Sequence, residues 1–597
     1  MSLKFVGTYV ELQSKLASLN GSWDDSHPNK KILKLNDGLM NWFESTGSIN
    51  FQGKAESKAK LESIVPSLLY PSETIFVAPK SIEQSDEESV GVPEINQTES
   101  LERQFLTTGI NEGELIIGIV STVGTESARI IRPLTDRLKV FGYHVEEIRI
   151  SSILPDFTGS PSEEYERIKH FMESGDSLRK SSDNNAILAL GAMQVISEKR
   201  KDNPSKTAYI LNSLKHPKEV ELLRKVYSDG FYLIGIHNDE KRRRLYLTDD
   251  KGLKQTEADE LIRIDENESI DHGQKTRDTY HLSDFFLNLG KNDDQVKNRL
   301  QRFLELIFSH PYKNPTFDEF AMFMAFNSSA RSGDLSRQVG AVLCRDNQII
   351  ATGANDVPKS GGGLYWAEVN PSTGEICDHI DGKDYTREVD SNKQAQAEII
   401  TEIAIKLLDS GVVASDKEID LRSILKQSKI SDLTEFGRIV HAEMDALLSC
   451  ARAGITTVDS TLYCTTFPCH NCAKHIIASG VKKVLYVEPY PKSRALDFHS
   501  ESIELNSELD VSLENNGLVT FEPFIGVGPR RFLDLFSMTL GAGSKLKRKA
   551  KDGAILDWNK STAPIRTPII ARSYIQIEAS AVEMWSGHND AMKKNII

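Results

Sequence analysis

His441, Glu443, Cys469 and Cys472 combine the residue types of a metal centre that could activate water. Zinc binds neutral imidazole and thiolate ligands, and catalytic zinc sites use three protein ligands so that the fourth tetrahedral position stays open. Two thiolates balance the charge of Zn²⁺, and the metal lowers the pKa of bound water to about 7. Glu443 adds a carboxylate that can carry protons. The four residues therefore predict a hydrolytic zinc centre, with His441, Cys469 and Cys472 as ligands.

The His441 and Glu443 pair needs a helix N-terminus. Residues two apart in mid-helix point to different faces, so these side chains can converge only where a helix begins. Residues 444–453 predict such a helix, and Gly454 is a typical stop signal.

The two cysteines open a second predicted helix, which ends near Gly480. The partial positive charge of a helix N-terminus favours thiolates at Cys469 and Cys472. Strands are predicted at 460–465 and 482–487. The resulting order of helix, strand, helix, strand is an α/β pattern.

A structural zinc knot is the alternative interpretation, with Cys464 closing the tetrahedron. Such a site has no use for a carboxylate two residues after its histidine. The pattern therefore favours a catalytic centre. The two motifs, H-x-E and P-C-x-x-C, also resemble the signature of zinc nucleobase deaminases. That resemblance implies attack of hydroxide on C4 of cytosine, with Glu443 moving protons to N3 and to the departing ammonia.

Further segments resemble deoxycytidylate deaminases. The similarity covers about residues 316–365 and 436–490. It implies that Asn355 holds the deoxyribose hydroxyl and that the segment with Arg331, Ser332 and Arg337 meets phosphate. An ordinary solvated surface is the alternative for the two arginines.

Tyr490 and Lys492 follow the last strand of the predicted site and are well placed for a triphosphate. Deoxycytidylate deaminases carry a different Asp-Lys-Tyr pattern there. The departure leaves dCTP and dCMP as open alternatives.

Additional segments are similar to the bacterial anti-phage dCTP deaminases, in which a P-loop-kinase-like domain precedes a deoxycytidylate deaminase domain. These segments are residues 210–217, 271–274, 488–493 and 524–531. The resemblance implies depletion of the deoxycytidine nucleotide pool during phage infection. It also implies a small noncoding RNA or other nucleic acid as inhibitor or activator, and a homo-oligomer.

Charge separates free nucleotides from polymers as substrates. A free nucleotide needs a few local cations, whereas a nucleic acid needs an extended basic track. The chain carries a net charge of −14, and its one dense basic run, 545–551, is expected to be a solvated loop. Two alternatives stay open: a deaminase that edits cytosine or adenine in RNA or DNA, and a nucleic-acid-triggered sensor with a deaminase effector.

A degenerate P-loop is predicted near residue 120. Residues 115–120 predict a buried parallel strand, and a helix is predicted at 128–141. The candidate nucleotide contacts are Gly118, Ser121, Thr122, Gly124 and Thr125. Thr125-Glu126 stands where the phosphate-binding lysine of the motif belongs. ATP hydrolysis is therefore not expected, and a scaffold, dimerisation or RNA-responsive role is favoured over nucleotide sensing.

The length of 597 residues allows three or four domains. The predicted fold class is multi-domain α/β. Its parts are a small α+β module (1–80), a flexible linker (81–113), a degenerate P-loop-kinase-like parallel-sheet domain (114–290), a zinc deaminase domain of α/β/α type (300–540) with an insertion (366–433), and a C-terminal extension (541–597). The first module distantly resembles the TATA-binding-protein-like module of type HIII ribonucleases, so nucleic-acid binding and a plain interaction role are both open.

Cysteine usage and hydropathy predict a soluble cytoplasmic protein. Six cysteines are too few for a disulfide framework, and no stretch of eighteen apolar residues occurs. Within the insertion, Cys377, Asp378 and His379 allow a second metal site, although a polar loop is favoured.

Overall fold

The computed structural model describes most of residues 3–69 and 113–569. Gaps within these ranges are residues 6–7, 17–18, 20, 28–29, 36–37, 45–46, 55–57, 59–60, 62–63, 66–67, 161–162, 205, 267–271, 291, 434, 490–492, 506–516, 542–545 and 551. The chain divides into two compact units, 1–96 and 97–597. Almost all of the predicted linker, 81–113, lies outside the described residues. Among the described helices, none is long and apolar enough to cross a membrane.

The first unit is a small antiparallel sheet with a short helix. The elements are α1 (Tyr9–Lys15), β1 (Ser22–Asp24), β2 (Lys31–Leu35), β3 (Gly38–Trp42) and β4 (Ile49–Gly53), with strand order β1-β2-β3-β4. Thr8 and Glu11 form a capping box that starts α1. Leu12 of α1 is buried against Leu33, Met40 and Trp42 of the sheet.

The second unit begins with a parallel-sheet domain. Its strands are β5 (Leu115–Ser121), β6 (His144–Arg149), β7 (Thr207–Asn212), β8 (Phe231–His237) and β9 (Phe285–Asn288), and its helices are α4 (Ala128–Val140), α5 (Glu164–Ser182), α6 (Ile187–Lys199), α7 (Pro217–Tyr227), α8 (Glu240–Leu245), α9 (Gln255–Glu266), α10 (Thr276–Tyr280) and α11 (Asp293–Ile307). The sheet order is β18-β9-β8-β5-β7-β6.

Helices cover both faces of this sheet, which explains why every residue of β5 is buried. Leu115, Ile117 and Ile119 share one core with α4 and α11, whereas Ile116 and Val120 share the other core with α6 and α7. Because α11 packs in the first core, the parallel-sheet domain extends to residue 307. The predicted bounds of this domain, 114–290, do not include α11.

The chain returns to this sheet from residue 526 onward. β18 (Gly526–Val527) pairs antiparallel with β9, and α19 (Phe532–Phe536) packs in the first core. The Arg566 backbone N–H donates to the Ile307 carbonyl oxygen at 2.7 Å. The described part of the predicted 541–597 extension therefore contributes to the parallel-sheet domain; residues 570–597 lie outside the described residues.

The region that contains His441, Cys469 and Cys472 is a second six-stranded sheet between helices. Its strands are β10 (Gly340–Arg345), β11 (Gln348–Ala354), β14 (Thr461–Thr466), β15 (Lys483–Glu488), β16 (Ile503–Leu505) and β17 (Val519–Pro523), in the order β11-β10-β14-β15-β17-β16, and its helices are α12 (Phe317–Ser329), α16 (Ala442–Ala453), α17 (His470–Ala478) and α18 (Ala495–Phe498). α16 and α17 cover one face, and α12 covers the other. The predicted order of helix, strand, helix, strand matches α16, β14, α17 and β15.

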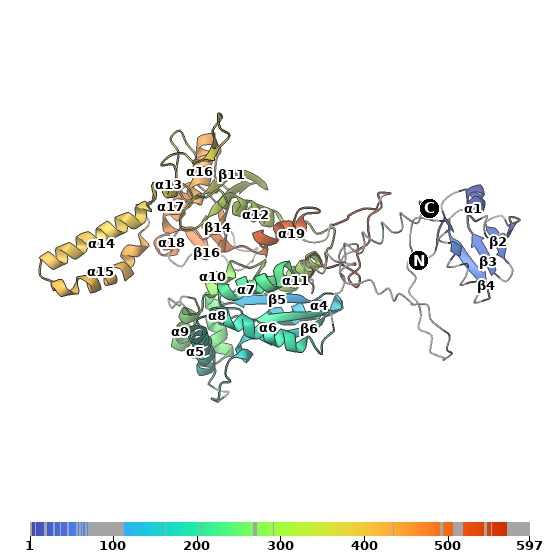
Figure 1. The fold of residues 1–597 in the computed structure, drawn as a ribbon, viewed down its shortest axis with the longest axis horizontal. Helices are drawn as coiled ribbons and strands as arrows, with labels where there is room; N and C mark the ends of the chain where they lie inside the picture. The colour runs from blue at the N-terminus through green and yellow to red at the C-terminus, as the bar shows by residue number, and fades with distance from the viewer. Residues whose placement is uncertain are drawn as a thin grey trace. The chain divides into compact units, whose positions relative to one another are not determined.

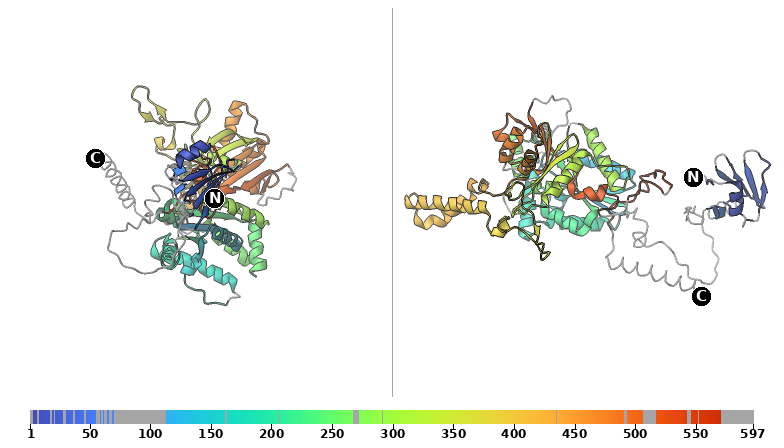
Figure 2. Two further views of the ribbon diagram at one scale, coloured as in Figure 1. Left: turned by 90° about the vertical axis from the view of Figure 1, so that its right-hand side faces the viewer. Right: turned by 90° about the horizontal axis from the view of Figure 1, so that it is seen from above.

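The insertion forms a hairpin and a pair of helices. It contains β12 (Glu368–Val369), β13 (Ile376–Cys377), α13 (Asp384–Arg387), α14 (Ser391–Asp409) and α15 (Glu418–Gln427). Figures 1 and 2 show α14 and α15 side by side, extending away from the second sheet.

Candidate active site

His441 and Glu443 lie at the start of α16. His441 is the N-cap residue and has extended backbone angles, with φ −70° and ψ 155°. Glu443 follows in the first helical turn, and its side chain is buried with 4% exposure. Both residues therefore lie at a helix N-terminus, as the sequence predicts.

Cys469 and Cys472 occupy the equivalent place on α17. Cys469 is the N-cap residue, and its Sγ accepts a hydrogen bond from the Cys472 backbone N–H at 3.4 Å. His441 Nδ1 lies 3.3 Å from Cys469 Sγ and 3.4 Å from Cys472 Sγ. Zinc bonds of about 2.0 Å to nitrogen and about 2.3 Å to sulfur, at tetrahedral angles, would hold these atoms roughly 3.5 Å apart. The donor set and its spacing therefore fit one zinc ion.

Cys464 is not part of this cluster. Within the described part of the chain, the only group of three or more potential ligands is His441, Cys469 and Cys472. Cys464 is fully buried in β14, where burial and the neighbouring Glu443 carboxylate raise the pKa of its thiol. Three ligands leave the metal an open position, which is the arrangement of catalytic zinc sites.

The electrostatics of the four residues suit metal binding and proton transfer. A hydrogen bond from Cys472, followed by one from His441, lowers the pKa of the Cys469 thiol to about 4. The thiolate is the form that binds zinc. Burial raises the pKa of the Glu443 carboxyl group, so this group can both accept and return a proton.

Three of the predicted substrate residues, Ser332, Arg337 and Asn355, fix the loop between α12 and β10 through hydrogen bonds. Asn355 Oδ1 accepts the Val339 N–H at 2.7 Å, and Asn355 Nδ2 donates to the Arg337 carbonyl oxygen at 2.8 Å. Ser332 Oγ donates to the Asn355 carbonyl oxygen at 2.6 Å. The Arg337 guanidinium pairs with Glu488 at 2.7 Å. The Asn355 side chain is therefore engaged in holding the backbone of residues 332–339.

Arg331 is different, because its guanidinium keeps unused donors. The group lies 3.7 Å from the centre of the Trp366 ring. Its Nε and Nη2 atoms are buried and have no hydrogen-bond partner among the described residues. Leaving charged donors buried and unpaired costs free energy that an anionic ligand would recover.

A buried ion pair that sequence reasoning missed ties the insertion to this region. Lys383 Nζ donates to the Asp356 carboxylate and, at 3.2 Å, to the Tyr365 carbonyl oxygen. The side chains of Lys383 and Asp356 are 5% and 1% exposed. Asp356 also forms a β-bridge with Val440, the residue before His441. Asp356 stands beside Asn355 in the sequence, but its partner lies in the insertion, so no local pattern connects them.

Two side chains of the possible second metal site have other partners. Asp378 accepts a hydrogen bond from the Tyr385 hydroxyl, and His379 Nδ1 is bonded to the Ile380 carbonyl oxygen. The described insertion residues contain no group of three potential ligands.

The remaining predicted contacts lie elsewhere. Ser121, Thr122, Gly124 and Thr125 line a separate cavity of the parallel-sheet domain. Gly118 does not line this cavity; it lies within β5, where a Cβ atom would come within 2.7 Å of the Leu214 side chain in the core. Tyr490 and Lys492 lie outside the described residues.

The segment that contains this site is similar to known proteins. Residues 315–488 match the family model of the cytidine and deoxycytidylate deaminase zinc-binding region. The deoxycytidylate deaminase of Enterobacteria phage T4 is 31% identical over 171 residues, which cover 29% of this chain and 77% of the phage protein. The ComE operon protein 2 of Bacillus subtilis (strain 168) is 37% identical over 91 residues, covering 14% of this chain and 48% of that protein. The deoxycytidylate deaminase of Schizosaccharomyces pombe is 23% identical over 304 residues, covering 49% and 73%.

A zinc ligand set at two helix starts, with a buried carboxylate beside it, places the protein among the zinc-dependent hydrolytic deaminases. The match to the phage T4 enzyme, at 31% identity over 77% of that protein, identifies the family within this class. This chain belongs to the deoxycytidylate deaminase family.

Proposed function

We propose that the enzyme deaminates free deoxycytidine nucleotides, dCTP or dCMP, to deoxyuridine nucleotides. The observation that carries this proposal is the position of Glu443, a buried carboxylate beside the His441, Cys469 and Cys472 cluster. The cluster lies within the segment that is similar to deoxycytidylate deaminases.

The chain's own residues account for the proton transfers. When bound, zinc supplies a Lewis acid that makes water more acidic. His441, Cys469 and Cys472 would hold the metal. Glu443 would accept a proton from the attacking water and pass it to N3 of cytosine, and would then take the second proton from the hydroxyl group now on C4 and pass it to the departing amine.

Substrate contacts are proposed for the loop beside the centre. The free donors of Arg331 favour it as the group that binds substrate phosphate, and the Trp366 ring holds its guanidinium in place. Arg337 could join it if the ion pair with Glu488 opens. Asn355 and Ser332 would shape the pocket for the deoxyribose through the backbone that they hold. Tyr490 and Lys492 remain candidates for a triphosphate.

Free nucleotides are favoured over RNA or DNA. The described part of the basic run includes Arg548, whose Nε donates to the Pro311 carbonyl oxygen at 2.9 Å and whose Nη2 contacts Asn314 Oδ1 at 3.3 Å. Arg548 thus holds the segment around residue 548 against residues 311–314. With a net charge of −14, the chain has few basic residues to spare for a track that binds nucleic acid.

The resemblance to anti-phage dCTP deaminases supports a biological role in depleting the deoxycytidine nucleotide pool during infection. Such an activity needs restraint, which we assign to a noncoding RNA or other nucleic acid, with the 1–80 module as its candidate contact. Assembly into a homo-oligomer belongs to the same proposal.

The test measures ammonia release by the zinc-loaded full chain from dCTP, dCMP, CTP and a cytosine-bearing oligonucleotide over a salt series. We expect conversion of a deoxynucleotide with weak salt dependence. Activity on the oligonucleotide alone, falling steeply with salt, would replace free-nucleotide deamination with editing. Activity that appears only after nuclease treatment of copurified nucleic acid would support the restraint.

A further inference from the structure

A cavity of about 530 Å³ lies in the parallel-sheet domain, away from the zinc ligands. It is lined by the carboxyl-end residues of β5, β6 and β7 together with α4 and α5. In parallel sheets, ligands bind at the carboxyl ends of the strands, where neighbouring connections diverge to opposite sides. β5 is such a strand, because it lies between β7 and β8.

The cavity wall is strongly basic although the chain is acidic. Its cationic residues are Arg132, Arg149, Arg167, Arg179, Lys215 and Lys251, and Glu147 is its one acidic residue. Arg179 is 1% exposed, and its Nε is buried without a hydrogen-bond partner among the described residues. Arg167 and Lys251 pair with Glu164, Arg179 pairs with Glu219, and Lys215 pairs with Asp265. An anionic ligand would therefore rely on the other two cations, Arg132 and Arg149.

The loop after β5 does not supply this anion site. The Asp265 carboxylate, which is 0% exposed, accepts the Val123 N–H at 2.8 Å, Lys215 Nζ at 2.8 Å and the Thr276 hydroxyl at 3.1 Å. Asp265 thus takes donors that a phosphate-binding loop would offer to its ligand.

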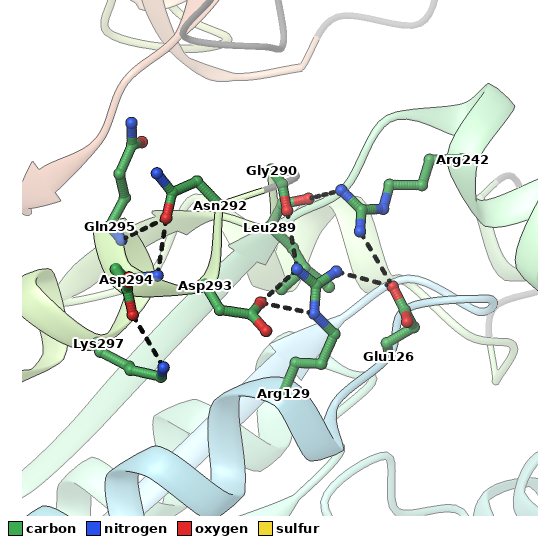
Figure 3. A network of polar contacts seen from close by, with 10 residues as sticks. All are labelled: Glu126, Arg129, Arg242, Leu289, Gly290, Asn292, Asp293, Asp294, Gln295 and Lys297. Atoms are coloured by element: carbon green, nitrogen blue, oxygen red, sulfur yellow. Dashed lines mark hydrogen bonds and ion pairs between the residues drawn. The ribbon is translucent and has the colours of Figure 1, made fainter.

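Glu126, which stands near the place of the motif's lysine, is also engaged. Figure 3 shows its carboxylate between Arg129 and Arg242, at 3.0 Å and 3.4 Å. Arg129 continues the network to the Gly290 carbonyl oxygen and to Asp293. The loop is therefore closed by the protein's own groups, and the free cations lie farther along the wall.

Arg132 and Arg149 are the cations available to a ligand. Arg132 is exposed on α4 and has no ion-pair partner among the described residues. Arg149 is 71% exposed and pairs only through Nε, with Glu147 at 3.1 Å. Next to them the cavity has an apolar wall that includes Leu154, Phe171 and Leu188.

We propose that this cavity binds a nucleoside phosphate, with the phosphate on Arg132 and Arg149 and the base against the apolar wall around Phe171. The volume suits a ligand of that size. The anion is held by arginines of α4 and β6 instead of by the loop after β5.

The test measures nucleotide binding to the zinc-loaded full chain carrying Glu443→Gln, so that no substrate is consumed. Equilibrium dialysis with ATP, GTP, dTTP, dCTP and inorganic phosphate gives affinity and stoichiometry, and hydrogen exchange of residues 121–132 and 164–182 gives the location. We expect at least one nucleotide to protect these segments. Adding Arg132→Ala and Arg149→Ala should weaken its binding at least tenfold, whereas Lys139→Ala on the same helix should not.

Three outcomes would overturn the proposal. No nucleotide protects the two segments; or the double variant binds the protecting nucleotide as tightly as its parent; or inorganic phosphate binds as tightly as the best nucleotide, which would leave a simple anion site. Because the readout is binding away from the zinc ligands, these outcomes are independent of whether the deaminase acts on free nucleotides.

Discussion

Gly353 of β11 lies directly against Ala442 in the first turn of α16. A Cβ atom at Gly353 would come within 2.1 Å of the Ala442 carbonyl oxygen and within 2.6 Å of the Ala446 backbone nitrogen. Glu443 follows Ala442, so the absence of a side chain at residue 353 lets the sheet set the position of the proposed proton carrier.

Gly353→Ala should therefore push the start of α16 away from the sheet. We expect a loss of stability of about 1–3 kcal/mol, typical of overpacking, together with a lower kcat. Gly290→Ala is the matched control, because a Cβ atom there meets nothing within 4 Å. Melting temperature and kcat are the measurements. Wild-type values for Gly353→Ala would show that this contact does not position Glu443.

Glu443→Gln should keep the shape of the buried side chain but remove its ability to carry protons. We expect kcat to fall by about 100-fold or more, while metal analysis still finds one zinc per chain. A variant that retains a tenth of the wild-type rate would contradict the role assigned to Glu443.

Cys469→Ala and Cys464→Ala separate a three-ligand centre from a four-ligand one. The first variant loses a zinc ligand, so it should purify without stoichiometric zinc and without activity. The second removes a buried thiol outside the cluster and should keep one zinc per chain. Zinc loss in both variants would indicate a structural knot that includes Cys464.

Lys383→Met should leave the Asp356 carboxylate buried without its partner. Breaking a buried pair on one side costs about 3–5 kcal/mol, so the melting temperature should fall. Because Asp356 bridges to the residue before His441, we also expect KM to rise. Lys359→Met removes the exposed pair with Glu368 and should change stability by less than about 1 kcal/mol. Equal melting temperatures for the two variants would argue against a role of the buried pair.

His216 should make stability depend on pH. Its neutral Nδ1 accepts the Lys218 N–H at 3.1 Å as the cap of α7, and burial, followed by the charge of Arg179, lowers its pKa from 6.5 to about 4. The folded state thus favours the neutral form. Its contribution is complete above pH 6.5 and is lost as the pH falls from 6.5 toward 4, by about 1.4 kcal/mol per pH unit.

His216→Asn keeps a capping acceptor that does not titrate in this range. The melting temperature of the wild type should therefore drop more between pH 7.5 and pH 5 than that of the variant. Parallel drops in the two proteins would exclude His216 as the source.

The zinc centre could be predicted from the sequence because its ligands lie at the starts of two local helices. His441 and Cys469 each precede an amphipathic segment, and short motifs specify both the helix start and the ligand. The parallel strands around β5 could also be predicted, since a run of apolar residues bounded by turns predicts a strand covered on both faces.

Contacts between residues far apart in the chain could not be predicted from the sequence. Lys383 meets Asp356 across the insertion, and Asp265 meets Val123 from a helix far along the chain. Neither contact leaves a local pattern, because each depends on which elements the fold brings together. Asn355 is predicted to hold the deoxyribose hydroxyl, and its side chain also bonds to the backbone at Val339 and Arg337, which no local pattern indicates.

The pairing of β18 with β9 has a consequence for synthesis. A ribosome must translate the whole catalytic region before the strand that covers β9 emerges. Until then a nascent chain presents β9 as an open edge, which other polypeptides can join. A product truncated before residue 526 would keep that edge exposed and should therefore aggregate more readily than the full chain.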